Sequence, residues 1–236
     1  MILHIDTATE FASICLSQNN TVVAFEENTE QKNHASFLQP AIQKMMLDVS
    51  HTLCDVDAIS VTNGPGSYTG LRVGLASAKG LCFALNKPLI TLNTLEVMAN
   101  AIVSQFGIRN LEFGIGEEEE NRTLLCPMID ARRMEVFAAI YNFDLKEVLP
   151  MNALILNENS FEQELKNNKI IFSGSGANKF KEICKSENAT FSTVQHSAKN
   201  MVDLATKKFT KNDFSNLAYT SPNYGKEFFT TAKKIF

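Results

Sequence analysis

The sequence predicts an α/β fold built from two related halves that follow one another along the chain. Of the 236 residues, 44% are hydrophobic, which is enough to bury a sizeable core. Short apolar strands alternate with amphipathic helices along most of the chain. A strand that ends in aspartate and is followed by a turn and a second strand occurs twice, around Asp6 and around Asp130. This repeat indicates two halves of similar topology.

Three antiparallel strands are expected first, over residues 2–5, 12–17 and 21–26. The second strand has alternating apolar residues, and an Asn-Asn pair after it is a typical hairpin turn. An amphipathic helix follows over residues 35–49, because its apolar residues recur at helical spacing.

A glycine-bearing loop joins a strand over residues 58–62 to a helix over residues 70–85. The segment 64–72 reads Gly-Pro-Gly-Ser-Tyr-Thr-Gly-Leu-Arg, in which Ser67 or Thr69 can cap the helix. Such a loop directs backbone amides at whatever lies in front of it, so it can hold an anion.

The helix after this loop has one face with little side chain on it, formed by Gly70, Gly74, Ser77 and Ala78. A glycine inside a helix costs about 1 kcal/mol relative to alanine, so close approach of another backbone is expected. The neighbour is either this domain's own sheet, which the pattern favours, or a partner subunit.

A strand over residues 89–92 and a helix over residues 94–104 complete a first half of order βββαβαβα, that of a ribonuclease-H-like domain. The acidic run 114–120 is expected to be a solvated linker. The second half is a looser copy of the first. Its expected elements are strands over 124–129, 135–141, 170–173 and 190–194, a weaker strand around Val148, and helices over 160–166, 177–185 and 198–209.

We therefore predict two ribonuclease-H-like domains in tandem, over residues 1–107 and 108–236, the architecture of the actin, Hsp70 and sugar-kinase class. In that class two aspartate turns face each other across a cleft and hold the phosphates and Mg²⁺ of ATP. Asp6 and Thr7 stand at the first turn, where Ala8 replaces a glycine of the class and weakens the case for tight ATP binding. Asp6 either holds Mg²⁺ through water or caps its turn.

Asp130 stands at the second turn, with Arg132 and Arg133 beside it. An arginine there either meets a phosphate or pairs with Asp130, and we prefer the structural interpretation. Gly174 and Gly176 lie between a strand and a helix, as the adenosine-contacting glycines of the class do. A lone Gly-x-Gly is a tight turn in most proteins. These residues are candidates for a degenerate nucleotide site.

No catalytic or metal-binding residues are predicted. His34 begins the first helix, but Leu38 stands one turn later, where a second metal ligand would be needed. The remaining histidines, His4, His51 and His196, have no ligand-like spacing. The sequence contains no Ser-His-Asp order, Gly-x-Ser-x-Gly elbow or paired carboxylates. We expect no cofactor.

Composition bounds the partners and the compartment. The net charge of −4 argues against a protein that binds nucleic acid by itself. The five cysteines are far apart in sequence and never form Cys-x-x-Cys, which indicates buried thiols in a reducing compartment. There is no signal peptide and no membrane-spanning apolar run, so a cytoplasmic protein without membrane contact is expected.

Several stretches together resemble the TsaD/TsaB family of bacterial tRNA-modification proteins. The segment 64–81 continues from the glycine loop into Gly-Leu-Ala-Ser-Ala-Lys-Gly-Leu, and residues 5–9, His34 and residues 130–136 match as well. The resemblance covers about the first two-thirds of the chain. The family's ending near Pro-x-Tyr-Leu-Arg is reduced here to Pro-Asn-Tyr at 222–224, so the role of the tail is open.

The resemblance implies a non-catalytic scaffold for threonylcarbamoylation of the adenosine next to the anticodon in tRNAs that read codons beginning with adenine. It implies a heterodimer with the transferase TsaD, a ternary complex with the ATPase TsaE, a homodimer when the chain is alone, and tRNA contact only through the complex. The family dimerises through its first two helices. The implied interface residues are His34, Leu38, Ile42, Met45, Gly70, Gly74, Ser77 and Ala78.

Two other classes of function were weighed against this one. An active ATPase or kinase of the same fold requires tight binding of Mg-ATP, against which Ala8 argues. A metallopeptidase requires a metal pair that His34 and Leu38 do not provide.

Overall fold

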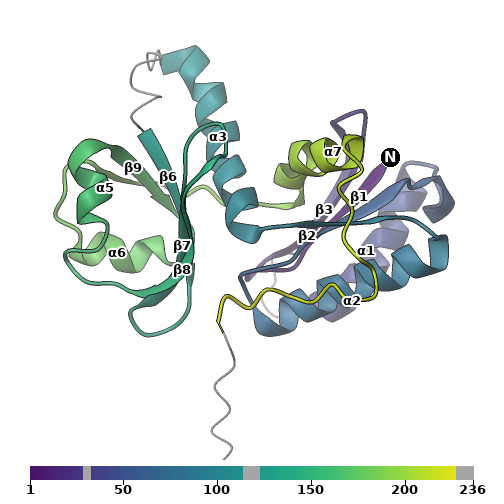
Figure 1. The fold of residues 1–236 in the computed structure, drawn as a ribbon. Helices are drawn as coiled ribbons and strands as arrows, with labels where there is room; N and C mark the ends of the chain where they lie inside the picture. The colour runs from purple at the N-terminus through teal and green to yellow at the C-terminus, as the bar shows by residue number, and fades with distance from the viewer. Residues whose placement is uncertain (29–32, 114–122, 227–236) are drawn as a thin grey trace, which may run out of the picture.

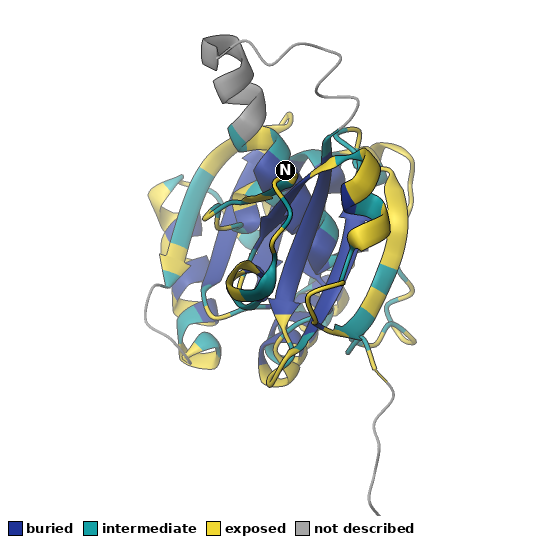
Figure 2. Cartoon of the chain, turned by 90° about the vertical axis from the view of Figure 1, so that its left-hand side faces the viewer, coloured by how far each residue is buried: buried dark blue, intermediate teal, exposed yellow. Residues whose placement is uncertain are grey.

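The protein is described by a computed structural model that covers residues 1–28, 33–113 and 123–226, without the side chains of residues 106–113. Two lobes are visible in Figure 1, each built on one five-stranded sheet. The inner strands of both sheets are largely buried, whereas the edge strands Thr21–Asn28 and Glu147–Ile155 contain no buried residue (Figure 2). Among the described helices, none has the length and apolar character needed to cross a membrane.

The first sheet has the strand order β3-β2-β1-β4-β5. Its central strand β1 pairs antiparallel with β2 and parallel with β4, and all residues of β1 and β4 are buried. The strands are β1 (Ile2–Asp6), β2 (Ala12–Gln18), β3 (Thr21–Asn28), β4 (Ala58–Thr62) and β5 (Leu89–Leu92).

Two layers of helices cover this sheet. On one face lie α1 (His34–Asp48) and α2 (Tyr68–Leu85), whose apolar residues share a core with β1, β2 and β4. On the other face lie the short helix η2 (Ala198–Met201) and α7 (Val202–Thr210), which pack with Ile2, Cys15 and Ile90. A short helix, η1 (Leu53–Asp55), precedes β4.

The second sheet has the order β10-β9-β6-β7-β8, which is the order of the first sheet read from the other edge. Its inner core contains Phe172 and Phe180, whose ring centroids are 4.9 Å apart. The elements of this lobe are β6 (Thr123–Asp130), β7 (Glu135–Tyr141), β8 (Glu147–Ile155), α5 (Glu162–Asn167), β9 (Lys169–Ser173), α6 (Ala177–Ile183) and β10 (Ala189–Phe191).

The helix α3 (Thr94–Phe113) lies between the two sheets. It packs through Leu95, Met98 and Ile102 against one face of the second sheet, and α5 and α6 pack against the opposite face. Its Asn100 side chain also donates a hydrogen bond of 2.8 Å to the carbonyl of Asn200 in η2, on the first lobe. This helix is longer than the predicted 94–104, and its observed end lies among residues that the sequence pattern assigns to no element.

The matching strand orders confirm the predicted fold class, two tandem ribonuclease-H-like sheets with helices. The boundary at residues 107 and 108 stays a prediction. Helix α7 was expected in the second half, but it packs on the first sheet, because its apolar face fits the side of β1 and β5 left open by α1 and α2. The acidic run, residues 114–120, lies outside the described part of the chain.

Candidate functional site

Asp6 ends the central strand of the first sheet and is held entirely by this chain's own groups. Its Oδ1 accepts hydrogen bonds from the Ala8 amide (3.1 Å) and the Thr62 hydroxyl (2.9 Å). Its Oδ2 lies 3.2 Å from Nε2 of His196, and both side chains are buried. The bond from Ala8 confirms the interpretation of Asp6 as the cap of its turn.

Burial by itself raises the pKa of Asp6. The nearby His196 side chain, together with the hydrogen bonds from Ala8 and Thr62, outweighs this effect and lowers the pKa below its usual value of 3.8. The carboxylate is therefore ionised and paired. A Mg²⁺ ion would have to compete with His196 for the same oxygen.

His196 is the member of this cluster that the sequence pattern did not reveal. It lies just before η2, and the next residues fix its position, because the Ala198 amide donates to the Ser13 hydroxyl over 2.9 Å. The sequence around His196 contains only a local signal, the Ser-x-x-Asn capping pattern by which Ser197 and Asn200 begin η2. Nothing in that signal points to Asp6.

Thr7 explains the glycines of α2. Its hydroxyl donates a 2.8 Å hydrogen bond to the carbonyl of Gly70. A Cβ atom on Gly70 would lie 2.0 Å from the Thr7 carbonyl oxygen, and one on Gly74 would lie 2.2 Å from the Thr7 hydroxyl. The small face of α2 thus meets the first turn of its own sheet, so the interpretation favoured by the pattern is confirmed.

This packing corrects the expected partner interface. Gly70, Gly74 and Ala78 are buried against their own domain, so a partner subunit cannot reach them. The same correction applies to the buried residues of α1, Leu38, Ile42 and Met45, which lie in the core between the helices and the sheet.

Two expected interface residues remain partly accessible. Ser77 is half-buried on α2. His34 is also half-buried, and its Nε2 donates a 3.0 Å hydrogen bond to the carbonyl of Thr9, which ties the start of α1 to the turn after β1. His34 therefore has a structural partner at the start of its helix.

The exposed side of α2 is apolar in the C-terminal half of the helix. Phe83 is 82% exposed, Ala76 is exposed, and a Cβ on Gly80 would have nothing within 4 Å. On the neighbouring helix α1, Leu47 is 69% exposed. We call Leu47, Ala76, Gly80 and Phe83 the outer helix face.

The glycine loop contacts its own chain. The Ser67 amide donates to the Ala8 carbonyl over 2.7 Å, and the Ser67 side chain caps α2 by accepting from the Gly70 amide. A Cβ on Gly66 would lie 2.2 Å from the Ala8 carbonyl oxygen. Of the two expected helix caps, Ser67 and Thr69, the structure uses Ser67, and the amide of Ser67 is used within the chain.

The corresponding residues of the second lobe form a separate group. Asp130 accepts hydrogen bonds from the Lys179 ammonium and, over 2.5 Å, from the Arg132 amide. Gly174 has a φ of +86°, and a Cβ on Gly176 would lie 2.7 Å from a Val136 methyl group. These glycines form a tight strand-to-helix turn. The cation that pairs with Asp130 is Lys179, whereas we had expected a neighbouring arginine.

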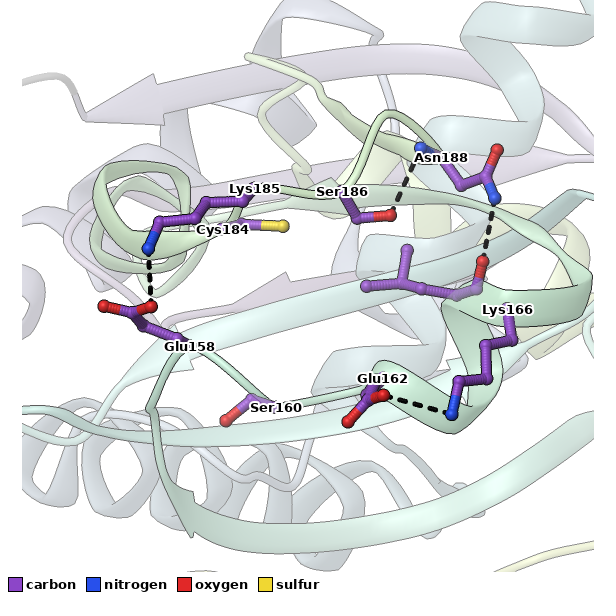
Figure 3. Close-up of a pocket in the computed structure, with 9 residues that line it drawn as sticks. Glu158, Ser160, Glu162, Lys166, Cys184, Lys185, Ser186 and Asn188 are labelled. Carbon is purple, nitrogen blue, oxygen red and sulfur yellow. Dashed lines mark hydrogen bonds and ion pairs between the residues drawn. The ribbon is translucent and has the colours of Figure 1, made fainter.

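A pocket at the far side of the second lobe is lined by charged residues (Figure 3). Lys185 is directed at Glu158 with a distance of 2.6 Å, and Lys166 at Glu162 with a distance of 3.0 Å. Because these charges are paired with one another, the pocket offers no unbalanced charge for a ligand.

The fold and these contacts define a class, a two-lobed α/β protein of actin-like architecture in which the first aspartate is held by residues of its own chain. The model of the family described as TsaD, tRNA N6-adenosine threonylcarbamoyltransferase, matches residues 24–228. The chain therefore belongs to this family, and within it to the TsaB (YeaZ) group.

Relatives from two bacteria support this assignment. The chain is 29% identical to the tRNA threonylcarbamoyladenosine biosynthesis protein TsaB of Bacillus subtilis, over 77% of this chain and 74% of that protein. It is 34% identical to the protein of the same name from Escherichia coli, over 61% of this chain and 55% of that protein.

Solved structures support the fold. YeaZ from Pseudomonas aeruginosa has a TM-score of 0.71 at 22% identity, covering 94% of this chain and 98% of that one. A crystal structure of a protein with similarity to peptidase YeaZ, also from Pseudomonas aeruginosa, has a TM-score of 0.77 at 22% identity and covers 95% and 99%.

Proposed function

We propose that this chain acts in the biosynthesis of tRNA threonylcarbamoyladenosine as a non-catalytic scaffold. It binds and activates the transferase TsaD, together with the ATPase TsaE, for modification of the adenosine next to the anticodon. The names of the Bacillus subtilis and Escherichia coli relatives support the pathway. The match to the TsaD family model supports a paralogue of that transferase.

The state of Asp6 is the observation that carries the non-catalytic role. In the actin, Hsp70 and sugar-kinase class the first aspartate serves the metal and phosphates of ATP. Here its two oxygens contact Ala8, Thr62 and His196. Binding a nucleotide metal would require displacement of the buried contact between Asp6 and His196.

The outer helix face supports a partner-binding role. Exposed large apolar side chains are typical of protein interfaces, and Phe83 on α2 and Leu47 on the neighbouring helix α1 are of this kind. Small residues such as Ala76 and Gly80 let another helix come close to α2. We propose that TsaD occupies this face, and that a second copy of the chain occupies it when TsaD is absent.

The test is reconstitution with TsaD, TsaE and tRNA, comparing Phe83→Glu with Ile155→Glu. Phe83 is 82% exposed on α2, and Ile155 is 69% exposed at the end of β8 on the other lobe. We expect Phe83→Glu to remove the complex peak in size-exclusion chromatography and to abolish stimulation of threonylcarbamoyl transfer. Ile155→Glu serves as the matched control. Equal behaviour of the two variants would exclude this face as the binding surface.

A second arm separates the scaffold from an active ATPase or kinase. Asp130→Asn changes the aspartate of the second turn, which is partly exposed and therefore replaceable without loss of the core. A scaffold should keep full stimulation of TsaD with this variant. ATP turnover by the isolated chain that disappears in Asp130→Asn would instead establish the enzyme.

A further inference from the structure

The C-terminal segment returns along the first lobe after α7. Ser215 lies beside the edge strand β5, where its hydroxyl is 2.7 Å from the hydroxyl of Thr91. The ammonium of Lys79 in α2 then donates to the carbonyls of Ala218 and Thr220, over 3.2 and 3.1 Å. This stretch, yellow in Figure 1, is fastened to β5 and α2 before it reaches the glycine loop.

The next residues contact the glycine loop. The Asn223 amide donates a 2.7 Å hydrogen bond to the carbonyl of Asn63. The ring of Tyr224 packs on that of Tyr68 with centroids 5.0 Å apart. A Cβ on Gly64 would lie 1.9 Å from the Asn223 carbonyl oxygen, so the backbone of the segment lies directly against the loop.

The segment then reaches the second lobe. Gly225 takes a φ of +74° in a turn closed by a 3.0 Å hydrogen bond from its amide to the Asn223 side chain. A Cβ on Gly225 would lie 2.6 Å from the ring of Phe137, and the ammonium of Lys226 forms an ion pair with Glu135. Phe137 and Glu135 both belong to β7.

We propose that residues 223–226 form a strap that fastens the two lobes to each other and fixes the angle between them. The lobes are also joined through α3, which contacts both of them, and through residues 192–197, which run from β10 to η2. Connections of this kind permit hinge motion, whereas an additional attachment elsewhere removes that freedom. In Figure 1 the yellow segment passes between the lobes below α3, which places the strap away from that helix.

The strap also covers the glycine loop, the element from which the sequence predicted anion binding. Asn223 and Tyr224 contact Asn63 and Tyr68, on either side of the glycines that begin the loop. A ligand approaching this side of the loop meets the strap first. The structure thus assigns the tail, whose role the sequence left open, to closing the molecule between its lobes.

The test measures the distance between the lobes in the full chain, with spin labels on two native thiols. Cys54 is exposed in η1 of the first lobe, and Cys184 is half-buried after α6 of the second. The other three cysteines, Cys15, Cys82 and Cys126, are buried. Pulsed electron–electron double resonance on the doubly labelled protein should give one narrow peak in the distribution of distances between the two labels.

Lys226→Glu breaks the ion pair with Glu135, and Lys207→Glu breaks an ion pair with Asp203 inside the first lobe as a matched control. We expect loss of the narrow peak in Lys226→Glu, retention in Lys207→Glu, and recovery in the double exchange Glu135→Lys with Lys226→Glu. Recovery requires that the two side chains meet across the lobes.

A truncation pair provides the second measurement. A chain that ends at residue 226 keeps the strap, whereas a chain that ends at residue 220 loses it. The strap predicts a narrow peak in the first and a broad distribution in the second. An unchanged narrow peak in both Lys226→Glu and the shorter chain would overturn the proposal, whatever the outcome for TsaD binding.

Discussion

Oδ2 of Asp6 lies 3.2 Å from Nε2 of His196, although the two residues come from opposite ends of the chain. The contact joins the end of β1 to the segment that leads into η2. It uses the carboxylate that this fold class directs at a nucleotide, and it anchors the return of the chain to the first lobe. One side-chain contact therefore has consequences for both the candidate site and the packing.

Replacement of His196 by alanine should destabilise the chain strongly. It leaves the buried Asp6 carboxylate without its contact to His196, which costs about 1–3 kcal/mol in the free energy of unfolding. Urea denaturation measures this. Lys207→Ala removes an exposed ion pair with Asp203 and should cost less than about 1 kcal/mol. A similar small loss in His196→Ala would contradict a stabilising role for the pair.

The same pair predicts a dependence on acid. Because the pKa of Asp6 is lower in the folded chain than its usual 3.8, the folded state binds fewer protons. The stabilisation is present above about pH 3.8 and is lost as the pH falls through the folded value. Asp6→Asn should lack this component of acid unfolding. If its stability falls as steeply as that of the unchanged chain, the prediction fails.

His4 predicts a second dependence at higher pH. Burial is the main cause that lowers its pKa from 6.5 to about 3, and the ring is hydrogen-bonded to the hydroxyls of Ser60 and Ser17, each over 2.7 Å. Between pH 6.5 and about 3, His4 binds a proton in the unfolded chain but not in the folded chain. The free energy of unfolding therefore falls as the pH drops through this range.

The slope from this residue approaches about 1.4 kcal/mol per pH unit. Urea denaturation of the unchanged chain and of His4→Gln across this range measures it. The variant should be less stable at neutral pH, because a packed and hydrogen-bonded ring is lost, but its stability should change less with pH. Parallel curves for the two proteins would show that His4 does not supply the slope.

Two glycines of α2 should respond to alanine in opposite directions. In Gly74→Ala the new methyl group meets the Thr7 hydroxyl, which the hydrogen bond to Gly70 holds in place. We expect a loss of about 1–3 kcal/mol from overpacking. Gly80→Ala meets nothing within 4 Å and should gain up to about 1 kcal/mol from helix propensity. Thermal unfolding of both variants checks this, and equal effects would contradict the packing described.

The thiols should differ sharply in reactivity. Burial raises the pKa of Cys15 to about 12 and that of Cys82 to about 11, and it raises the pKa of Cys126 as well. A disulfide reagent at mildly alkaline pH should therefore react first with Cys54, which is exposed, and next with Cys184. Titration of the native and urea-unfolded chain counts the groups. Rapid reaction of more than two thiols in the native chain would contradict this order.

The helix after the glycine loop, α2, shows which contacts can be predicted from the sequence and which cannot. Its spacing predicted a close backbone contact, and the structure confirms that contact at Thr7. The family resemblance implied that the same residues form a partner interface. This prediction was wrong for Gly70 and Gly74, which are buried against Thr7 of their own chain. The exposed side of that helix, around Phe83, could be read only after the buried side was known.

The Asp6 cluster and the strap could not be predicted, since each joins segments that are distant in sequence. His196 carries no spacing signal toward Asp6, and the pairing arises because η2 packs on the sheet beside β2. Lys226 and Glu135 are likewise brought together only by the path of the chain across the lobes.

The sequence by itself determined the strands, most helices and the repeat of the two halves, because each depends on residues that are near neighbours along the chain. Tertiary structure decided what covers the small face of α2, that His196 contacts Asp6, and where the tail lies. Those outcomes depend on which surfaces remain uncovered once both sheets have formed, and local periodicity does not encode them.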